Sequence, residues 1–200
     1  MVKPVNKIIR ALIFSDFLLQ AGWGLIGPIF AIFLIGKIQG GSVAMVGFLA
    51  TAYWLTKSLI QPFIAHQFDK NHGEKDDFIF LMGGLILANL IPLGYIFVSL
   101  PWHIFLLEII RGAAMACVVP TWSAIFTRHI DKGREAFSWS LESTSIGFAA
   151  GLAGAFGGLI AITLGFEAIF ILVSAFGLLS SFSLFLVKRS FFQTNDPKSP

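Results

Sequence analysis

Five ionisable side chains lie inside long apolar stretches of this sequence, and each of them needs an explanation. They are Asp16, Lys57, Glu108, Arg111 and Glu142. A charge at the centre of a membrane helix costs about 2.5–3.5 kcal/mol even on a lenient scale, so it should face protein or a wet cavity. Such groups carry protons, bind charged solutes or pair to hold helices in register. We expect at least one of them to take part in substrate or ion coupling, with structural ion pairing as the alternative.

The depths of these charges along the apolar stretches place four of them near one layer. At a rise of about 1.5 Å per residue, Asp16 and Glu142 lie roughly 8 Å inside one boundary, and Lys57 roughly 14 Å inside it. Arg111 lies about 14 Å from the opposite boundary by the same measure. These four are therefore expected to meet near the midplane. Glu108, one helical turn from Arg111, is expected to pair with it locally.

Four further side chains in the same stretches complete the predicted cavity. They are Gln20, Trp23, Trp54 and Trp122. Tryptophan in a cavity stacks on sugars and on aromatic or cationic ligands. Plain core packing is the alternative interpretation for these tryptophans, so their presence does not choose a ligand.

The composition shows what kind of element must position these residues. Hydrophobic residues make up 56% of the 200 residues and charged residues only 12%, and the mean hydropathy is +0.82. A soluble domain carries about 25% charged residues, so this chain has too little charge to cover a water-facing surface. The single cysteine, Cys117, excludes an intramolecular disulfide and any CxxC metal or redox pair. The sequence predicts an integral membrane protein.

Six apolar stretches are long enough to cross a bilayer as helices, which takes about 20 residues each. They cover residues 11–36, 43–66, 78–99, 102–127, 137–163 and 167–187. The predicted fold class is an all-α polytopic membrane protein, with one transmembrane domain over residues 1–189 and a polar cytoplasmic tail over 190–200. The first stretch is too long for a signal peptide and is expected to be an uncleaved helix. The third carries no charge and the sixth only Glu167 at its first residue, so both are expected to face mostly lipid.

The distribution of basic residues predicts the orientation. Only Lys37 lies on the side of the membrane away from the termini. The eleven on the side of the termini are Lys3, Lys7, Arg10, Lys70, Lys75, Arg128, Lys132, Arg134, Lys188, Arg189 and Lys198. Because short loops rich in Lys and Arg stay inside, both termini are expected to be cytoplasmic in a multi-pass protein of the cell membrane. These charges are topology signals, so no nucleic-acid partner is expected.

Glycine and proline suggest where helices bend or approach one another. Gly22, Gly24, Gly27 and Pro28 are expected to interrupt the first helix, and Pro120 the fourth. The fifth stretch carries two small-residue pairs at the spacing that allows close helix approach. The predicted packing residues are Gly147, Gly151, Gly154 and Gly158. Ordinary helix packing explains them without a function.

The segment between the second and third stretches provides a more specific motif. It reads Ala-His-Gln-Phe-Asp-Lys-Asn-His-Gly-Glu-Lys over residues 65–75. It resembles the signature loop of the major facilitator superfamily, Gly-x3-Asp-(Arg/Lys)-x-Gly followed by basic residues. Asp69, Lys70 and Gly73 match, whereas Ala65 replaces the first glycine and the gap from Asp to Gly is one residue longer. The resemblance implies that this loop gates the cytoplasmic side.

The fourth stretch gives a second match to the same family. Its pattern Arg-x2-Gln-Gly-x-Gly-Ala-Ala with a later proline is similar to residues 108–116 and Pro120. Glu108 stands at the arginine position and Arg111 at the glutamine position, so the family's role in proton transfer carries over to Arg111. In the fifth stretch Gly157 and Gly158 match the end of an antiporter pattern, with Gly154 in place of its proline.

The resemblance covers essentially the whole chain and implies the amino-terminal six-helix half of a secondary transporter, built from a 3+3 helix repeat. Substrate in this family binds at the midplane between two such halves, which share one membrane orientation. The leading expectation is a parallel homodimer that moves a small solute by alternating access, coupled to a proton or another ion. The expected partners are the lipid bilayer, a small-molecule substrate with or without H⁺, and a second copy or a separate second six-helix half.

Two alternatives to this expectation remain open from the sequence, and a third, an enzyme, is considered with them. A longer protein cut short or a split transporter would supply the second half from another source. A receptor or regulatory pseudo-transporter would use the same helices without transport. An intramembrane enzyme is not expected, because no nucleophile and base or metal-ligand cluster is apparent, and neither a metal nor a cofactor is expected. The five membrane charges sum to −1, too close to balance to choose between an anionic and a cationic substrate.

Overall fold

The computed structural model describes residues 5–71 and 74–188 of the chain. All the regular structure in this part is helical, in the order α1 (Lys7–Ile26), α2 (Phe30–Lys37), α3 (Val43–Asn71), α4 (Glu74–Tyr95), α5 (Pro101–His129) and α6 (Glu135–Leu186). All of these except the short α2 are long and apolar enough to cross a membrane. The predicted all-α, polytopic fold is confirmed.

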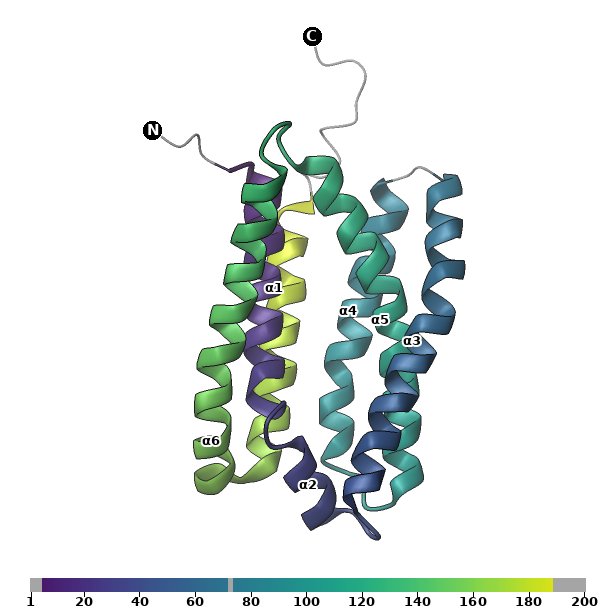
Figure 1. The fold of residues 1–200 in the computed structure, drawn as a ribbon, viewed down its shortest axis with the longest axis vertical. Coiled ribbons are helices and arrows are strands. Elements are labelled where there is room, and N and C mark those ends of the chain that lie inside the picture. Colours follow the sequence, from purple (N-terminus) through teal and green to yellow (C-terminus); the bar gives the residue numbers. More distant parts are fainter. Residues whose placement is uncertain (1–4, 72–73, 189–200) are drawn as a thin grey trace.

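Helix α6 is two membrane-length helices joined at a sharp turn. Gly165, with φ 82° and ψ 173°, lies outside the helical region in the middle of its 52 residues. Glycine adopts this backbone conformation without steric cost because it has no Cβ. Figure 1 shows the first arm, residues 135–164, running down the bundle and the second arm, residues 166–186, returning beside α1. The turn lies within the break predicted after residue 163.

Proline acts differently at the two sites where the sequence predicted an interruption. The first stretch is indeed broken, because α1 ends at Ile26 and α2 begins at Phe30, on either side of Pro28. The expectation for Pro120 was wrong, because α5 continues through it. Pro120 has no N–H to donate to the preceding turn. The hydroxyl of the next residue, Thr121, donates to two carbonyl oxygens of that turn, those of Cys117 at 2.7 Å and Val118 at 3.0 Å.

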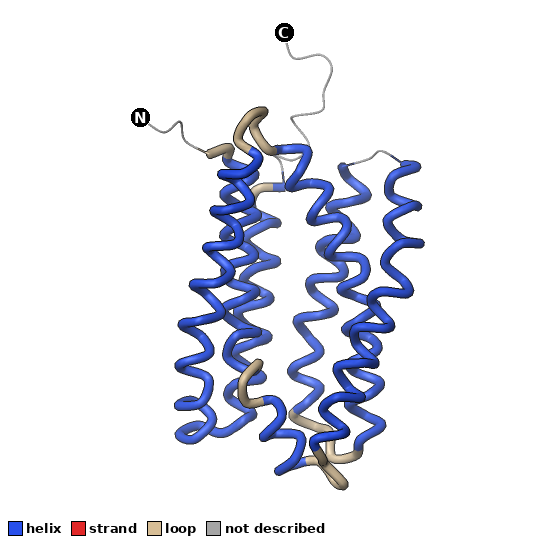
Figure 2. The backbone as a smooth tube through the Cα atoms, in the orientation of Figure 1, coloured by secondary structure: helices blue, strands red, loops and turns tan. Residues whose placement is uncertain are grey.

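The two ends of the bundle differ in charge. Helix α1 begins and α6 ends at the same end, where α3 and α5 also end (Figures 1 and 2). We call this the basic end, because Lys7, Arg10, Lys70 and Arg128 lie there. The opposite end, which we call the far end, carries Lys37 at the end of α2.

The helices pack in two groups that repeat the same pattern. One group holds α1 with both arms of α6, and the other holds α5 with α3 and α4 (Figure 1). A further contact joins α4 to the second arm of α6, where Asn89 lies against Gly177. Exchanging the first three membrane helices for the last three maps this contact pattern onto itself. The arrangement agrees with the predicted 3+3 repeat.

The close approach of α1 to α6 uses different small residues from those predicted. A Cβ added at Gly147, Gly151 or Gly158 would meet nothing within 4 Å, and one at Gly154 would make only ordinary contacts. At Gly157 it would overlap the carbonyl oxygen of Leu25 on α1. A Cβ added at Gly24 of α1 would lie 2.8 Å from the Cβ of Ala153 and 3.0 Å from the Cα of Ala150. Small residues therefore cover more than one face of the first arm of α6. The predicted glycine row lies largely on the face beside the one that contacts α1.

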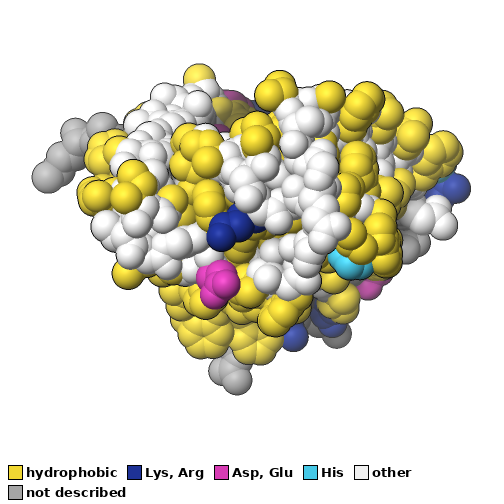
Figure 3. All heavy atoms as spheres, turned by 90° about the horizontal axis from the view of Figure 1, so that it is seen from below, with side chains coloured by type: hydrophobic (Ala, Val, Ile, Leu, Met, Phe, Trp, Pro, Cys, Tyr) yellow, Lys and Arg dark blue, Asp and Glu magenta, His cyan; other side chains and the backbone are white. Residues whose placement is uncertain are grey.

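Exposure to the surroundings is greatest on α3 and on the first arm of α6. Phe63 on α3 and Ile162 on the first arm have 79% and 86% of their surface exposed. The expectation that the third membrane helix faces mostly lipid was wrong, because α4 buries Leu81, Leu85 and Asn89 against α5 and α6. Figure 3 shows hydrophobic side chains over much of the far end, with basic and acidic groups near its middle.

Candidate functional site

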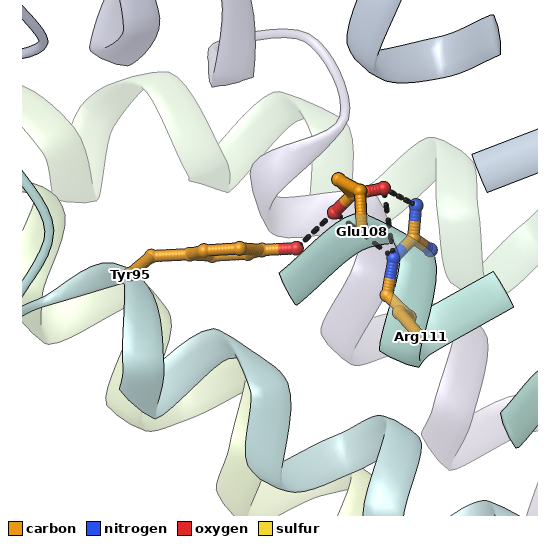
Figure 4. A network of polar contacts seen from close by, with 3 residues as sticks. All are labelled: Tyr95, Glu108 and Arg111. Carbon is orange, nitrogen blue, oxygen red and sulfur yellow. Dashed lines mark hydrogen bonds and ion pairs between the residues drawn. The ribbon is translucent and has the colours of Figure 1, made fainter. Parts of the chain in front are cut away.

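A three-residue polar network crosses from α4 to α5 inside the membrane-spanning region (Figure 4). Glu108 and Arg111 lie one helical turn apart on α5, and the guanidinium donates through Nη2 to Glu108 Oε2 at 2.5 Å and through Nε to both carboxylate oxygens at 3.1 Å. The hydroxyl of Tyr95, at the end of α4, donates to Oε1 of the same carboxylate. The local pair predicted from the sequence is present, and every oxygen of Glu108 has a donor.

Arg111 also contacts two aromatic rings. Its guanidinium carbon lies 3.8 Å from the ring centroid of Tyr53 on α3 and 4.6 Å from that of Trp23 on α1. A cation over an aromatic face is attracted by the electron-rich ring, most strongly where water is excluded. Arg111 therefore ties three helices together through one side chain.

These residues line a cavity of about 370 Å³, which we call the aromatic cavity. Its lining includes Gln20 and Trp23 of α1, Trp54 of α3, and both Glu108 and Arg111 of α5. Trp54 is 56% exposed, so it borders the cavity instead of filling the core. The predicted residues from the first, second and fourth stretches are thus brought together.

Lys57 lies against the Trp54 wall of the same cavity, although it is not itself one of the lining residues. Gly112 allows α5 to approach the α3 backbone, since a Cβ there would lie 2.7 Å from the Tyr53 carbonyl oxygen and 3.4 Å from the backbone nitrogen of Lys57. The Lys57 ammonium lies 4.7 Å from the centroid of the Trp54 ring, and it is close enough to Arg111 for the two positive charges to repel each other. Lys57 is half-buried.

Asp16 and Glu142 form a second polar centre nearer the basic end. Asp16 comes from α1 and Glu142 from the first arm of α6, and their carboxyl groups are near enough to interact electrostatically. Both line a cavity of about 230 Å³, which we call the carboxylate cavity, together with Trp122 and Ser123 of α5. Trp122 stacks on Phe126 with their ring centroids 4.7 Å apart. Its indole nitrogen is buried and has no partner among the described residues.

The single layer of charge expected from the sequence is in fact two adjoining sites. Arg111 lines the aromatic cavity and Lys57 lies against its Trp54 wall, whereas Asp16 and Glu142 line the carboxylate cavity. Leu19, Gln20 and Met115 line both cavities. The depth estimates failed to separate the sites because the rise per residue gives height along the membrane and not position across it. Gln20 is the polar side chain shared by the two.

A third cluster lies at the basic end, beside the predicted gating loop. Asp69 lines a cavity of about 270 Å³ together with Asp77 at the start of α4 and Arg128 at the end of α5. Arg128 forms an ion pair with Asp77, whose side chain is only 4% exposed. Lys70 is in the last turn of α3, and Gly73 lies outside the described residues. The loop's acidic residue is therefore next to an ion pair that joins two other helices.

The comparison with family models agrees with this arrangement. The model of the Major Facilitator Superfamily matches residues 12–200. The chain belongs to the major facilitator superfamily. Superfamily members are membrane transporters, and this one is a multi-pass membrane protein with transmembrane helices in contact with lipid. No curated protein sequence matches the chain.

The sequence alone did not identify several residues of these sites as functional candidates. Tyr53 and Tyr95 are isolated tyrosines in apolar stretches. Only the fold brings Tyr95 to Glu108 and Tyr53 to Arg111. Asp77 and Arg128 lie between the predicted apolar stretches, where a charge that is paired in the fold cannot be told from one that is solvated. Among the described residues, no group of three or more His, Cys, Asp or Glu side chains is placed to hold a metal ion.

Proposed function

We propose that the chain is a six-helix unit of a proton-coupled secondary transporter that moves a small solute by alternating access. The observation that supports this most directly is that Asp16 and Glu142, from two different helices, line one small cavity. Two carboxylates that share a small cavity repel each other when both are ionised, which favours a proton on one of them. Ionisable residues inside the membrane commonly mark proton or ion pathways.

The location of this pair suits a coupling site. Asp16 and Glu142 come from α1 and the first arm of α6, so movement between these helices changes the distance between the two carboxyl groups. Gln20 lines both this cavity and the aromatic cavity, which we propose as the substrate site. Proton release and substrate movement are then linked through one region of α1.

The remaining predicted residues receive corresponding roles in this proposal. Glu108, Arg111 and Lys57 set the charge of the substrate cavity, and Trp23, Trp54 and Trp122 form its walls and those of the adjoining cavity. Asp69, Lys70 and Gly73 gate the basic end, which we take as cytoplasmic from the excess of Lys and Arg there. The protein then lies in the cell membrane with both termini inside, and it is not an enzyme.

Proton coupling is tested by transport in proteoliposomes with an imposed pH gradient. Uptake of a panel of labelled solutes is measured for the unmodified protein and for the Asp16→Asn and Glu142→Gln variants. Both substitutions keep the size of the side chain and remove the titratable group, so they should abolish the response of uptake to the gradient. Glu167→Gln, at the exposed far-end surface, is the matched control. Gradient-driven uptake that survives in both cavity variants would contradict the proposal.

A transport cycle of this kind needs a second six-helix unit across the cavity, and we propose that a second copy supplies it in a parallel homodimer. The exposed apolar faces of α3 and of the first arm of α6 are the surfaces for this contact. The predicted row Gly147, Gly151, Gly154 and Gly158 lies largely open on that arm, where it allows a partner helix to approach.

Single cysteines placed at Leu59 on α3 and Phe156 on α6, in a Cys117→Ser background, test the dimer. Cross-linking between copies in native membranes supports the homodimer, whereas cysteines on the buried faces of the same helices, at Leu49 and Ala153, should not react. Cross-links to a different polypeptide would favour a split transporter. Absence of any cross-link, together with no uptake, would favour a receptor or regulatory role.

A further inference from the structure

The charges of the two adjoining cavities have opposite signs. Arg111 and Glu108 line the aromatic cavity, and Lys57 adds a second positive charge against its Trp54 wall. At the carboxylate cavity both ionisable residues, Asp16 and Glu142, are acidic. The near balance of the five charges in the sequence therefore conceals one positive and one negative site.

The Glu108–Arg111 pair presents its positive side to the aromatic cavity. The side chain of Glu108 is 3% exposed, whereas that of Arg111 is 18% exposed. Tyr95 and Arg111 already donate to both oxygens of the carboxylate. The bonds of Arg111 to Glu108 use Nε and Nη2, which leaves Nη1 without a hydrogen-bond partner in the described part of the chain (Figure 4). A guanidinium has five N–H donors, so the free edge can still bind an acceptor.

Lys57 adds a full positive charge that no carboxylate neutralises. Within residues 5–71 and 74–188, no acidic side chain forms an ion pair with it. Its ammonium lies against the Trp54 ring and within electrostatic reach of Arg111. Two cations held close together in a region of low dielectric are stabilised by an anion between them.

The other walls of the cavity are flat and apolar. Trp23, Trp54, Tyr53 and Phe30 provide aromatic surfaces, and Gln20 provides an amide that both donates and accepts. Aromatic rings favour stacked or edge-to-face contacts with other rings. The cavity therefore combines a positive centre with surfaces suited to a planar apolar body.

We propose that the aromatic cavity binds a small organic anion with an aromatic body, with its carboxylate placed between Lys57 and the free edge of Arg111. This proposal rests on the proposed transport function and names the substrate class. A cation of the same shape would meet two positive charges and only a buried, fully bonded carboxylate. A neutral solute would leave those two charges without a counter-ion.

The same arrangement accounts for coupling between substrate and proton. An anion in the aromatic cavity lies next to the carboxylate cavity, across Gln20, Leu19 and Met115. Its negative charge attracts a proton held by the Asp16–Glu142 pair. Substrate and proton then cross together as a neutral load, which is symport.

Binding is measured by quenching of tryptophan fluorescence in nanodiscs, because Trp23 and Trp54 lie in the cavity walls. The probes are 4-nitrobenzoate, 4-nitrobenzyl alcohol and 4-nitrobenzylammonium, which share a quenching ring and differ in charge. Saturable quenching by the anion alone is the expected result, and it should weaken when Trp54 is replaced by Phe. Equal or stronger saturable quenching by the cation or the alcohol would overturn the proposal.

Variants of Lys57 separate charge from packing. Lys57→Gln should weaken 4-nitrobenzoate binding about 10- to 100-fold, the usual effect of removing a charged hydrogen-bond partner. Lys57→Glu should abolish anion binding and admit the benzylammonium probe. Lys37→Gln, at the far end, is the matched control and should bind as the unmodified protein does. Unchanged affinity in Lys57→Gln would also overturn the proposal.

These measurements need no ion gradient, so they distinguish the substrate class from the transport function. Anion binding in a protein whose uptake does not respond to a pH gradient would retain this inference and contradict the proposed coupling. Gradient-driven uptake of other solutes, without saturable 4-nitrobenzoate binding, would retain the proposed function and contradict this inference.

Discussion

The contact between Gly157 on the first arm of α6 and Leu25 on α1 supports a quantitative prediction. An alanine Cβ at position 157 would overlap the Leu25 carbonyl oxygen and lie 2.9 Å from its carbonyl carbon and 3.1 Å from its Cα. Non-bonded carbon atoms prefer about 3.5–4.0 Å. Because the obstructing atoms are backbone and cannot rotate away, the two helices must separate by several tenths of an ångström or more.

Gly158, the next residue of the same helix, is the matched control. A Cβ there meets nothing within 4 Å, so Gly158→Ala should be neutral or gain up to about 1 kcal/mol from the lower chain entropy of alanine. Gly157→Ala gains the same term but loses about 1–3 kcal/mol through overpacking, and more if the helices cannot adjust. The expected difference between the variants is about 2 kcal/mol.

Thermal unfolding of the two variants in nanodiscs tests this reasoning. For a chain of this size, about 2 kcal/mol corresponds to roughly 4–8 °C in melting temperature. Gly157→Ala should melt lower than Gly158→Ala by that amount and should also alter ligand binding, since α1 carries Asp16, Gln20 and Trp23. Equal melting temperatures would refute the close approach of α1 and α6.

Three further substitutions test polar contacts between or within helices. Glu108→Gln should destabilise the protein by about 3 kcal/mol, because it leaves Arg111 without its counter-ion. Replacing Glu108 with Leu and Arg111 with Met together should cost clearly less than the sum of the two single changes. Melting shifts that simply add would exclude the coupling between the two residues. Ser15→Ala should cost about 1 kcal/mol, because the Ser15 and Ser180 hydroxyls, 2.8 Å apart, bond each other in a buried contact, and the double alanine variant should cost little more. Asp77→Asn should lower the melting temperature by a few degrees and leave anion binding unchanged; weaker anion binding would show that the basic end and the cavity are coupled.

The sequence predicted local relations well. The Glu108–Arg111 pair follows from a spacing of one helical turn, and the turn at Gly165 follows from a short polar break between two apolar stretches. The basic end and the number of membrane-length segments follow from composition in the same way. These features depend only on neighbours along the chain, which the sequence displays directly.

Relations across helices were predicted only in part. Asp16 of α1 and Glu142 of α6 line one cavity, and their helix depths gave the right height without showing that Lys57 lies elsewhere, against the Trp54 ring. The glycine row on α6 was assigned to packing, although alanines and Gly157 form the actual contact with α1. Facing directions of this kind depend on helix rotation, which a uniformly apolar helix leaves undetermined.

The location of Glu108 and Arg111 on one turn of α5 also bears on how the protein enters the membrane. Their ion pair needs no other helix, so it can form while α5 is still alone in the lipid. The free-energy cost of inserting α5 is then that of one neutral pair instead of two separate charges. Asp16 and Glu142 have no such local partner, because they lie on helices that are synthesised far apart in time. Helix α1 must therefore keep Asp16 protonated or near the interface until the first arm of α6 arrives. Assembly of the carboxylate cavity is then a late step, which follows the insertion of nearly the whole bundle.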